Sequence, residues 1–314
     1  MMPITALGLS VANICSLNDM ALGGCLKNCL HAWQTIGVSD WVFNIVSTGY
    51  RIPFKFVPTN PPVEKGAHDV LVTEAAGLSA KSAIVPTEHE AGEFIISYFS
   101  VTKPRSLGKY RPILNLKNFN QAVKKYKFRM ESVSHVREWI KQNAFCVGMD
   151  LKDAFLHVPI NHMFQKYLKF SWLGQLFKWT VLPFGLRCSP RVLTNVLKPA
   201  IAYLRITFAM FISIYLDDML IQSETACGAY YHGQIAALVL MILGWSLNWE
   251  KSNFLPSQQF THWGFDWDTS TMLISCPNQR LNTFRMFARL HYSLGLFLCI
   301  LVSACLSTWS LLDP

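Results

Sequence analysis

The sequence predicts an α+β fold in which helices back an antiparallel sheet. Short apolar runs typical of strands lie near residues 167–170, 176–182, 211–222 and 260–267. Longer apolar patterns typical of helices lie near residues 190–203 and 229–245. Because the strands and helices alternate irregularly, the pattern favours an α+β arrangement.

The earlier part of the chain contains further elements. Residues 1–66 read as a lead-in of helix-like apolar stretches, which ends in the proline-rich linker at residues 57–62. A helical pattern follows near residues 131–140, where Val133, Val136 and Ile140 fall on one face. The sequence shows no internal repeat and no low-complexity tract.

Two adjacent carboxylates, Asp217 and Asp218, lie between the apolar runs 211–214 and 219–221. The two runs predict the arms of a β-hairpin with the acids at its tip. Carboxylates at such a tip are costly unless a cation compensates them, and a divalent metal there suits phosphoryl chemistry. The alternative is a solvated turn.

A third acid, Asp150, ends the apolar run of residues 144–149. A strand that ends there could place Asp150 beside Asp217 and Asp218 in one sheet. Acids gathered in this way could hold two Mg²⁺ ions. In the alternative reading, Asp150 caps a helix and Asp153 is a surface residue.

The chain of 314 residues carries a net charge of +9. Residues 94–130 contain nine basic residues and no acid, interleaved with Tyr110, Phe119, Tyr126 and Phe128. This composition suits a nucleic-acid backbone and stacked bases, with a generic basic face as the alternative. The nine cysteines form no Cys-x-x-Cys pair, which favours reduced core residues of an intracellular protein in the cytoplasm or nucleus.

Six motifs occur in the order found in retroelement reverse transcriptases: residues 109–117, 149–155, 182–190, 215–218, 247–252 and 260–265. The residues of these motifs resemble most closely those of DIRS-type (tyrosine-recombinase) retrotransposons. This similarity includes residues 189–199 and the segment 41–54 that precedes the polymerase domain. The resemblance covers roughly residues 23–285. It implies a right-hand polymerase fold, with fingers, a palm and a truncated thumb, and RNA-directed DNA polymerase activity.

The resemblance divides the chain into four parts: lead-in and linker at 1–66, fingers with part of the palm at 67–149, palm at 150–275, and the start of a thumb at 276–314. It makes Asp150, Asp217 and Asp218 the catalytic carboxylates and the ligands of two Mg²⁺ or Mn²⁺ ions. Lys251 lies where the family has a lysine that protonates the leaving pyrophosphate, with a solvated lysine as the alternative.

The resemblance also implies a nucleotide site. Lys152 and the backbone N–H groups of Asp153 and Ala154 would hold the incoming triphosphate. Phe155 would lie beneath the sugar and exclude a 2′-hydroxyl, so that dNTPs are selected, although Phe155 could also be ordinary core. The residues expected to bind the nucleotide are Lys103, Arg111, Lys152, Asp153, Ala154, Phe155, Phe184 and Gly185.

Within this set, Phe184 and Gly185 would pack against the nascent base pair. Arg111 and Lys103 would clamp the triphosphate from a finger strand. Residues 103–108 are two residues longer than the usual Lys-Pro-x-Gly spacing, so the identity of the upstream cation stays open. Beyond this site, Ser189 predicts an N-cap with Pro190 in the first helical turn, and Pro199 predicts a kink in that helix.

The primer and template are expected to contact Tyr215, Trp263 and Gly264, because Trp263-Gly264 resembles the primer grip; a plain β-turn is the alternative. Partners implied are an RNA or DNA template with its primer and dNTPs, while the oligomeric state stays open. Residues 290–312 contain no charged side chain and could form a thumb helix or span a bilayer. The thumb is favoured and membrane association is not expected. The alternative function is a catalytically inactive, nucleic-acid-binding remnant.

Overall fold

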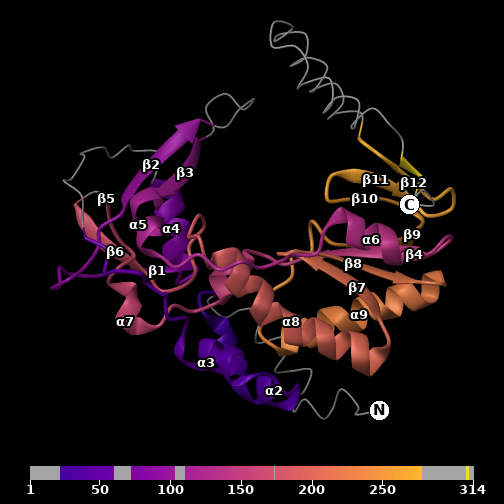
Figure 1. Cartoon of the computed structure of the whole chain (residues 1–314), viewed down its shortest axis with the longest axis horizontal. Helices are drawn as coiled ribbons and strands as arrows, with labels where there is room; N and C mark the ends of the chain where they lie inside the picture. The colour runs from indigo at the N-terminus through magenta and orange to yellow at the C-terminus, as the bar shows by residue number, and fades with distance from the viewer. Residues whose placement is uncertain (1–21, 60–71, 103–109, 173, 278–308, 311–314) are drawn as a thin grey trace, which may run out of the picture. The chain divides into compact units, whose positions relative to one another are not determined.

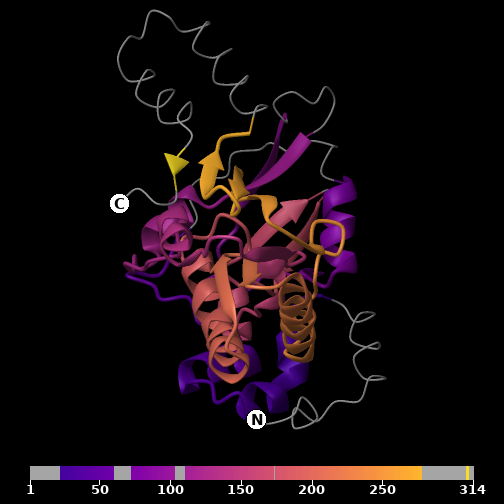
Figure 2. The same ribbon diagram turned by 90° about the vertical axis from the view of Figure 1, so that its right-hand side faces the viewer.

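The computed structural model of the chain describes residues 22–59, 72–102, 110–172, 174–277 and 309–310. They form two compact units, each assembled from separate chain segments (Figures 1 and 2). The first unit comprises Met1–Arg129, Leu151–Tyr203 and Leu238–Ser246, and the second Met130–Asp150, Leu204–Ala237 and Leu247–Pro314. The four-part division expected from the sequence is not tested by these units and stays a prediction.

The first unit contains short helices and two small sheets. Its helices are η2 (Cys25–Cys29), α2 (Leu30–Thr35), α3 (Asp40–Thr48), α4 (Val72–Ala80), α5 (Lys117–Ala122), η4 (Ala154–His157), α7 (His162–Gln165) and most of α8 (Ser189–Phe208). Its strands are β1 (Ile84–Pro86), β2 (Ser97–Thr102), β3 (Tyr110–Asn115), β5 (Lys169–Trp172) and β6 (Gln175–Trp179). They form an antiparallel sheet in the order β1-β6-β5 and an antiparallel pair β2-β3.

The described part of the predicted lead-in packs onto this unit. Helix α3 is capped by the Ser39 hydroxyl, which accepts from the N–H of Val42, and it ends at Gly49. The φ of Gly49 is 91°, and a Cβ there would lie 2.4 Å from the backbone nitrogen of Asn161. The backbones of Tyr50 and Asn161 are hydrogen-bonded. Only glycine allows this close approach, which joins α3 to the segment before α7.

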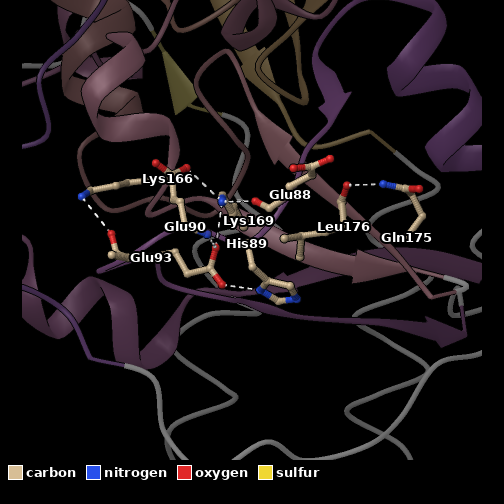
Figure 3. Close-up of polar contacts among 9 residues, drawn as sticks. Glu88, His89, Glu90, Glu93, Lys166, Lys169, Gln175 and Leu176 are labelled. Atoms are coloured by element: carbon tan, nitrogen blue, oxygen red, sulfur yellow. Dashed lines mark hydrogen bonds and ion pairs between the residues drawn. The ribbon is translucent and has the colours of Figure 1, made fainter.

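A buried lysine fixes the segment between β1 and β2 (Figure 3). The Lys169 side chain on β5 is fully buried, and its Nζ donates to the carbonyl oxygen of Glu88 at 2.6 Å. The same Nζ lies 2.9 Å from Glu90 Oε1 and 2.7 Å from Glu93 Oε2. A buried charge is tolerated only when it is paired and hydrogen-bonded, so this network holds residues 88–93 against β5.

The second unit is built around a four-stranded antiparallel sheet in the order β7-β8-β4-β9. A second antiparallel sheet has the order β10-β11-β12-β13. The elements of the second unit are α6 (Val133–Trp139), β4 (Phe145–Asp150), β7 (Phe211–Tyr215), β8 (Asp218–Ser223), most of α9 (Ala226–Ile242), β9 (Asn253–Ser257), β10 (Gln259–His262), β11 (Phe265–Asp268), β12 (Leu273–Ser275) and β13 (Trp309–Ser310).

The two faces of the main sheet carry different neighbours, because successive side chains of a strand point to opposite faces. On one face, Gly233 of α9 packs against Val147 of β4. On the other face, Cys146 of β4 and Leu220 of β8 share a hydrophobic core with α6 and the second sheet. The other buried members of that core are Val136, Ile140, Trp267, Met272 and Ile274. In Figures 1 and 2, α9 and the second sheet accordingly lie on opposite sides of the main sheet.

The predicted strands and helices are confirmed with small shifts at their ends. The run 211–222 forms the β7–β8 hairpin, and the run 260–267 forms β10 and β11. The helix expected to follow Ser189 includes it as its first residue, one position earlier than an N-cap. The Ser189 hydroxyl instead donates to the carbonyl of Pro183. Pro199 lies inside this helix without ending it. The apolar run 290–312 falls largely outside the described residues.

The Lys169 network predicts a pH-dependent stability. Desolvation alone would raise the pKa of Glu93, but hydrogen bonds from Lys169 and His89 lower it from 4.5 to about 2. A lowered carboxyl pKa stabilises the fold above about pH 4.5, and this contribution of about 3 kcal/mol is lost as the pH falls towards 2. We expect Glu93→Gln to lower the free energy of unfolding by a similar amount at neutral pH, measured by urea denaturation.

The difference between wild type and Glu93→Gln should shrink as the pH falls from about 4.5 towards 2. Glu224→Gln is the matched control, because Glu224 pairs with Lys141 at an exposed position and its loss should change stability little. A difference that stays constant across this pH range would contradict the role given to Glu93.

Candidate functional site

Asp217 and Asp218 lie at the tip of the β7–β8 hairpin, as the sequence predicts. Tyr215 pairs with Asp218, which leaves Leu216 and Asp217 as the two loop residues. Leu216 has a φ of 58°, a left-handed conformation that costs about 1–3 kcal/mol for a branched residue. Such strain is tolerated where surrounding structure imposes it, and it is found most often at functional sites.

Asp150 is the last residue of β4 and is paired directly with Asp218 of β8. Directly opposed residues of antiparallel strands have Cα atoms about 4.5–5.5 Å apart and side chains on the same face. Asp150 therefore lies beside the hairpin acids, on the sheet face that α6 and the second sheet cover further along the strands. Like charges in such a pair repel, so this arrangement needs compensation.

The surroundings of Asp150 and Asp217 disfavour the charged form of each carboxyl group. Burial raises the pKa of Asp150, the charges of Asp217 and Asp218 add to the effect, and Lys251 opposes it. Burial likewise raises the pKa of Asp217, with a further contribution from Asp218. The pKa of each of these two carboxyl groups is thus raised above its ordinary value, and perturbed pKa values of this kind are typical of functional sites.

The segment after α9 holds Asp150 in place. The backbone N–H of Asp150 donates to the Ser252 hydroxyl at 3.0 Å, and the N–H of Asn248 donates to the Asp150 carbonyl at 2.8 Å. The Ser252 hydroxyl in turn donates to the Asn248 carbonyl. The same turn brings Lys251 Nζ to 3.9 Å from Asp150 Oδ1, with the lysine side chain 68% exposed. Lys251 is therefore placed at the acidic cluster, while its chemical role stays a prediction.

The donor set fits a hard divalent cation. Asp150 Oδ1 is buried and has no hydrogen-bond partner among the described residues, so it is an orphaned anionic oxygen. Asp218 Oδ1 lies 3.4 Å from Nδ1 of the buried His262. Carboxylate oxygens are the ligands that Mg²⁺ prefers. Within the described residues, no group of three or more His, Cys, Asp or Glu side chains is arranged so that it could hold a metal ion.

Tyr215, Trp263 and Gly264 come together next to the acids in the second unit. Trp263 and Gly264 form the two-residue turn between β10 and β11, and their φ values of 51° and 75° are those of a type I′ turn. The Trp263 ring lies 5.4 Å from the Tyr215 ring and stacks on His262 at 4.8 Å. The expected β-turn is present, and its role in holding a primer stays a prediction.

In the first unit, the chain after Asp150 turns tightly. Asp153 has a φ of 49° and precedes η4, and its carboxylate is paired with Lys81 Nζ at 2.8 Å. The N–H of Lys152 donates to the carbonyl of Ser246, whose own N–H donates to Nε2 of His157. His157 is fully buried, and burial lowers its pKa to about 4, so it is a neutral acceptor that stabilises this turn.

Phe155 and Phe184 form an edge-to-face pair with ring centroids 5.3 Å apart. Phe184 is 52% exposed. Asn120 of α5 clamps the following loop, which contains Gly185. Its Nδ2 donates to the Gly185 carbonyl, and its Oδ1 accepts from the N–H of Arg187. A single amide side chain therefore fixes the loop that presents Phe184.

The remaining expected residues are less fully described. Arg111 lies in β3 opposite Val101, and Lys103 lies outside the described residues. Sequence reasoning missed several residues that support the site. They are Lys81, Asn120, His157, Asn248, Ser252 and His262. For most of them the available signal was polarity next to a motif. Asn120 stands between the buried Phe119 and Ala122, and His157, Asn248, Ser252 and His262 lie in or beside the motif segments. Lys81 lies far from every motif, and no local signal pointed to it.

Comparisons with known proteins identify the family of the chain. A family model described as reverse transcriptase (RNA-dependent DNA polymerase) matches residues 101–267, more than half of the chain. The chain belongs to the reverse transcriptase family. The match spans the hairpin acids, Asp150 and the Trp263–Gly264 turn. The expected fold class, an α+β right-hand polymerase fold with antiparallel sheets, is confirmed.

Several viral polyproteins contain a similar segment. Polyprotein P3 of Commelina yellow mottle virus is 25% identical over 174 residues, 52% of this chain and 9% of that protein. The enzymatic polyprotein of Figwort mosaic virus (strain DxS) is 24% identical over 177 residues, 56% of this chain and 25% of that protein. The Gag-Pro-Pol polyprotein of Human T-cell leukemia virus 2 is 29% identical over 118 residues, 35% of this chain and 8% of that protein.

The chain thus spans about a quarter or less of the length of these relatives. Among the residues that the structure describes, no helix has both the length and the apolarity required to cross a membrane.

Proposed function

We propose that the chain is an RNA-directed DNA polymerase that adds dNTPs to a primer on a nucleic-acid template. The single observation that carries the proposal is the pairing of Asp150 with Asp218 at the tip of the β7–β8 hairpin. Membership of the reverse transcriptase family supports the same reaction. A structural turn has no need of three mutually repelling acids, whereas nucleotidyl transfer requires them.

In this proposal, Asp150, Asp217 and Asp218 hold two divalent cations, Mg²⁺ or Mn²⁺. The orphaned Asp150 Oδ1 and the raised pKa of Asp150 and Asp217 support this assignment. The cations would supply charge stabilisation to the attacking and leaving oxygens. Asp150 and Asp217 are the principal ligands, with Asp218 in support.

The reaction forms a bond between the primer 3′-oxygen and the α-phosphorus of the dNTP, and it breaks the bond from that phosphorus to pyrophosphate. The primer hydroxyl loses its proton and the pyrophosphate gains one. Lys251, exposed and 3.9 Å from Asp150 Oδ1, is positioned to donate the latter proton.

The nucleotide would be bound mainly by first-unit residues. Lys152 and the backbone of Asp153 and Ala154 are assigned to the triphosphate, together with Arg111 and Lys103. Lys152 follows Asp150 by two positions in the sequence. Phe155 is assigned to the sugar, and Phe184 with Gly185 to the nascent base pair.

Tyr215, Trp263 and Gly264 are assigned to the primer and template. The contact between the Tyr215 and Trp263 rings supports a joint role. We further propose that the chain derives from a DIRS-type retrotransposon, on the wording of its motifs, and that it acts inside the cell, in the cytoplasm or nucleus.

Primer extension tests the proposal. The chain, mixed with an RNA template, a DNA primer, dNTPs and Mg²⁺, should lengthen the primer, and Asp217→Asn should reduce the rate by about 10³-fold or more, since a principal cation ligand is lost. Extension is measured by gel electrophoresis of a labelled primer, and binding by fluorescence anisotropy of the same duplex.

Asp266→Asn is the matched control, because this β11 carboxylate bonds to Thr261 in the same unit and should be dispensable. A wild-type chain that binds the template–primer without extending it would contradict the polymerase and favour the inactive nucleic-acid-binding remnant.

Phe155→Ala tests the sugar assignment. Removing the ring should raise ribonucleotide incorporation relative to deoxyribonucleotide incorporation by about tenfold or more, because the space for a 2′-hydroxyl opens. The ratio is measured by single-nucleotide extension with dNTP and rNTP. Phe155→Tyr keeps the ring and should keep the selectivity; an unchanged ratio in Phe155→Ala would show that Phe155 is a core residue only.

A further inference from the structure

An arginine of the first unit lies over two exposed aromatic rings. The Arg191 guanidinium carbon of α8 is 4.4 Å from the centre of the Tyr126 ring and 5.8 Å from the centre of the Trp41 ring. The Tyr126 and Trp41 residues remain 43% and 40% exposed. Such cation–π contacts hold the rings in fixed orientations while part of each stays open to solvent.

Two chain segments distant in sequence bring these rings together. The backbone N–H of Lys55 donates to the Ala122 carbonyl, and the N–H of Lys124 donates to the Pro53 carbonyl. Helix α3, which carries Trp41, is joined to the same unit through Tyr50 and Asn161. The predicted lead-in therefore contributes half of a surface whose other half is the segment after α5.

This surface is strongly basic. The described segments 41–57 and 115–129 contain no acidic residue. Their basic residues, together with Arg191 at the centre, project from the same segments as the rings. The exposed ones are Arg51, Lys55, Lys117, Lys124, Lys125, Lys127 and Arg129, and Phe56 and Phe128 are exposed aromatics among them.

A hollow adjoins the Trp41 ring. Its volume is about 280 Å³, and it is lined by Trp41, Asn44, Thr48, Tyr50 and Arg51 together with Ile45 and Gly49. A cation, an amide and a hydroxyl beside an aromatic ring are groups that suit a phosphate or sugar next to a stacked base.

We propose that Trp41, Tyr126 and Arg191 form a stacking surface for the unpaired bases of single-stranded nucleic acid, with the surrounding lysines and arginines along its phosphates. This role goes beyond the proposed function, which assigns none of these residues, and it does not require polymerase activity. Flat exposed rings combined with basic residues are the features by which proteins hold single strands.

A single strand fits this surface better than the competing partners. The bases of a duplex are stacked on one another, so a duplex would contact the basic residues but would offer no open base face to the aromatic rings. An acidic protein segment would also be drawn by charge alone. Only an unpaired strand offers phosphates and open base faces at once.

The test measures binding of the full chain to a labelled single-stranded oligonucleotide by fluorescence anisotropy, without dNTPs. Trp41→Ala and Tyr126→Ala should each weaken binding by about tenfold, which corresponds to about 1.4 kcal/mol of lost stacking. The slope of affinity against salt should stay unchanged in both. Lys125→Gln should instead lower that slope by about one, because it removes a phosphate contact.

Trp41→Phe keeps a ring and should retain most of the affinity, which separates stacking from a folding defect. Tyr231→Ala is the matched control, since this tyrosine is 59% exposed on α9 of the second unit and should have no effect. The loss in Trp41→Ala should be smaller for a blunt duplex.

Unchanged single-strand affinity in Trp41→Ala would overturn the proposal, as would an equal loss for a polyglutamate peptide, which would indicate an acidic protein partner. Repeating the measurement in Asp217→Asn keeps the two proposals separate. Asp217→Asn should lose extension and keep its Trp41-dependent binding, whereas a wild-type chain without extension activity whose binding still depends on Trp41 would refute the polymerase alone.

Discussion

The second unit depends on the placement of like charges at the ends of adjacent strands. The pairing of Asp150 with Asp218 puts two carboxylates on one sheet face, and the strained Leu216 turn adds Asp217. Lys251 places a cation beside Asp150, Nδ1 of His262 lies near Asp218, and Ser252 fixes the backbone of Asp150. In the function we propose, the sheet register would serve chemistry at some cost to stability, as is common at functional sites.

The first unit is stabilised differently, because most of its helices and strands are short. Its sheets are small, so hydrogen bonds from single polar side chains hold its loops in place. Lys169 holds the segment before β2, Asn120 clamps the loop that follows Phe184, and His157 accepts from the segment after α9. Each of these side chains is hydrogen-bonded to a residue far away in sequence. The bonds of Asn120 and His157 rigidify loops that carry predicted nucleotide contacts.

The sequence was sufficient for features that local patterns encode. The arms of the hairpin around Asp217 and the helix after Ser189 follow from apolar periodicity, and the ordered motifs pointed to the family. The polar side chains that hold the loops could not be found in this way. Lys169 and Glu93 are 76 residues apart, and Asn120 and Gly185 are 65 apart. Nothing in a local window shows that such residues meet.

The same limit applies to the exposed rings of the first unit. Tyr126 was recognised as one of several aromatics in a basic stretch, but its contact with Arg191 required the fold. The segment before residue 66 was interpreted as a lead-in because its apolar stretches end in prolines. Its attachment through Gly49 depends on the close approach of the Asn161 backbone, which sequence patterns do not reveal.

Counting bound cations tests the central claim most directly, because the claim is that Asp150 and the hairpin acids bind the same cations. Mn²⁺ binding to the full chain can be followed by the electron paramagnetic resonance signal of the free ion. The wild-type chain should bind Mn²⁺ at the acidic cluster, and Asp150→Asn should lose that binding as fully as Asp217→Asn does. Equal Mn²⁺ binding by the wild type and Asp150→Asn would contradict the account.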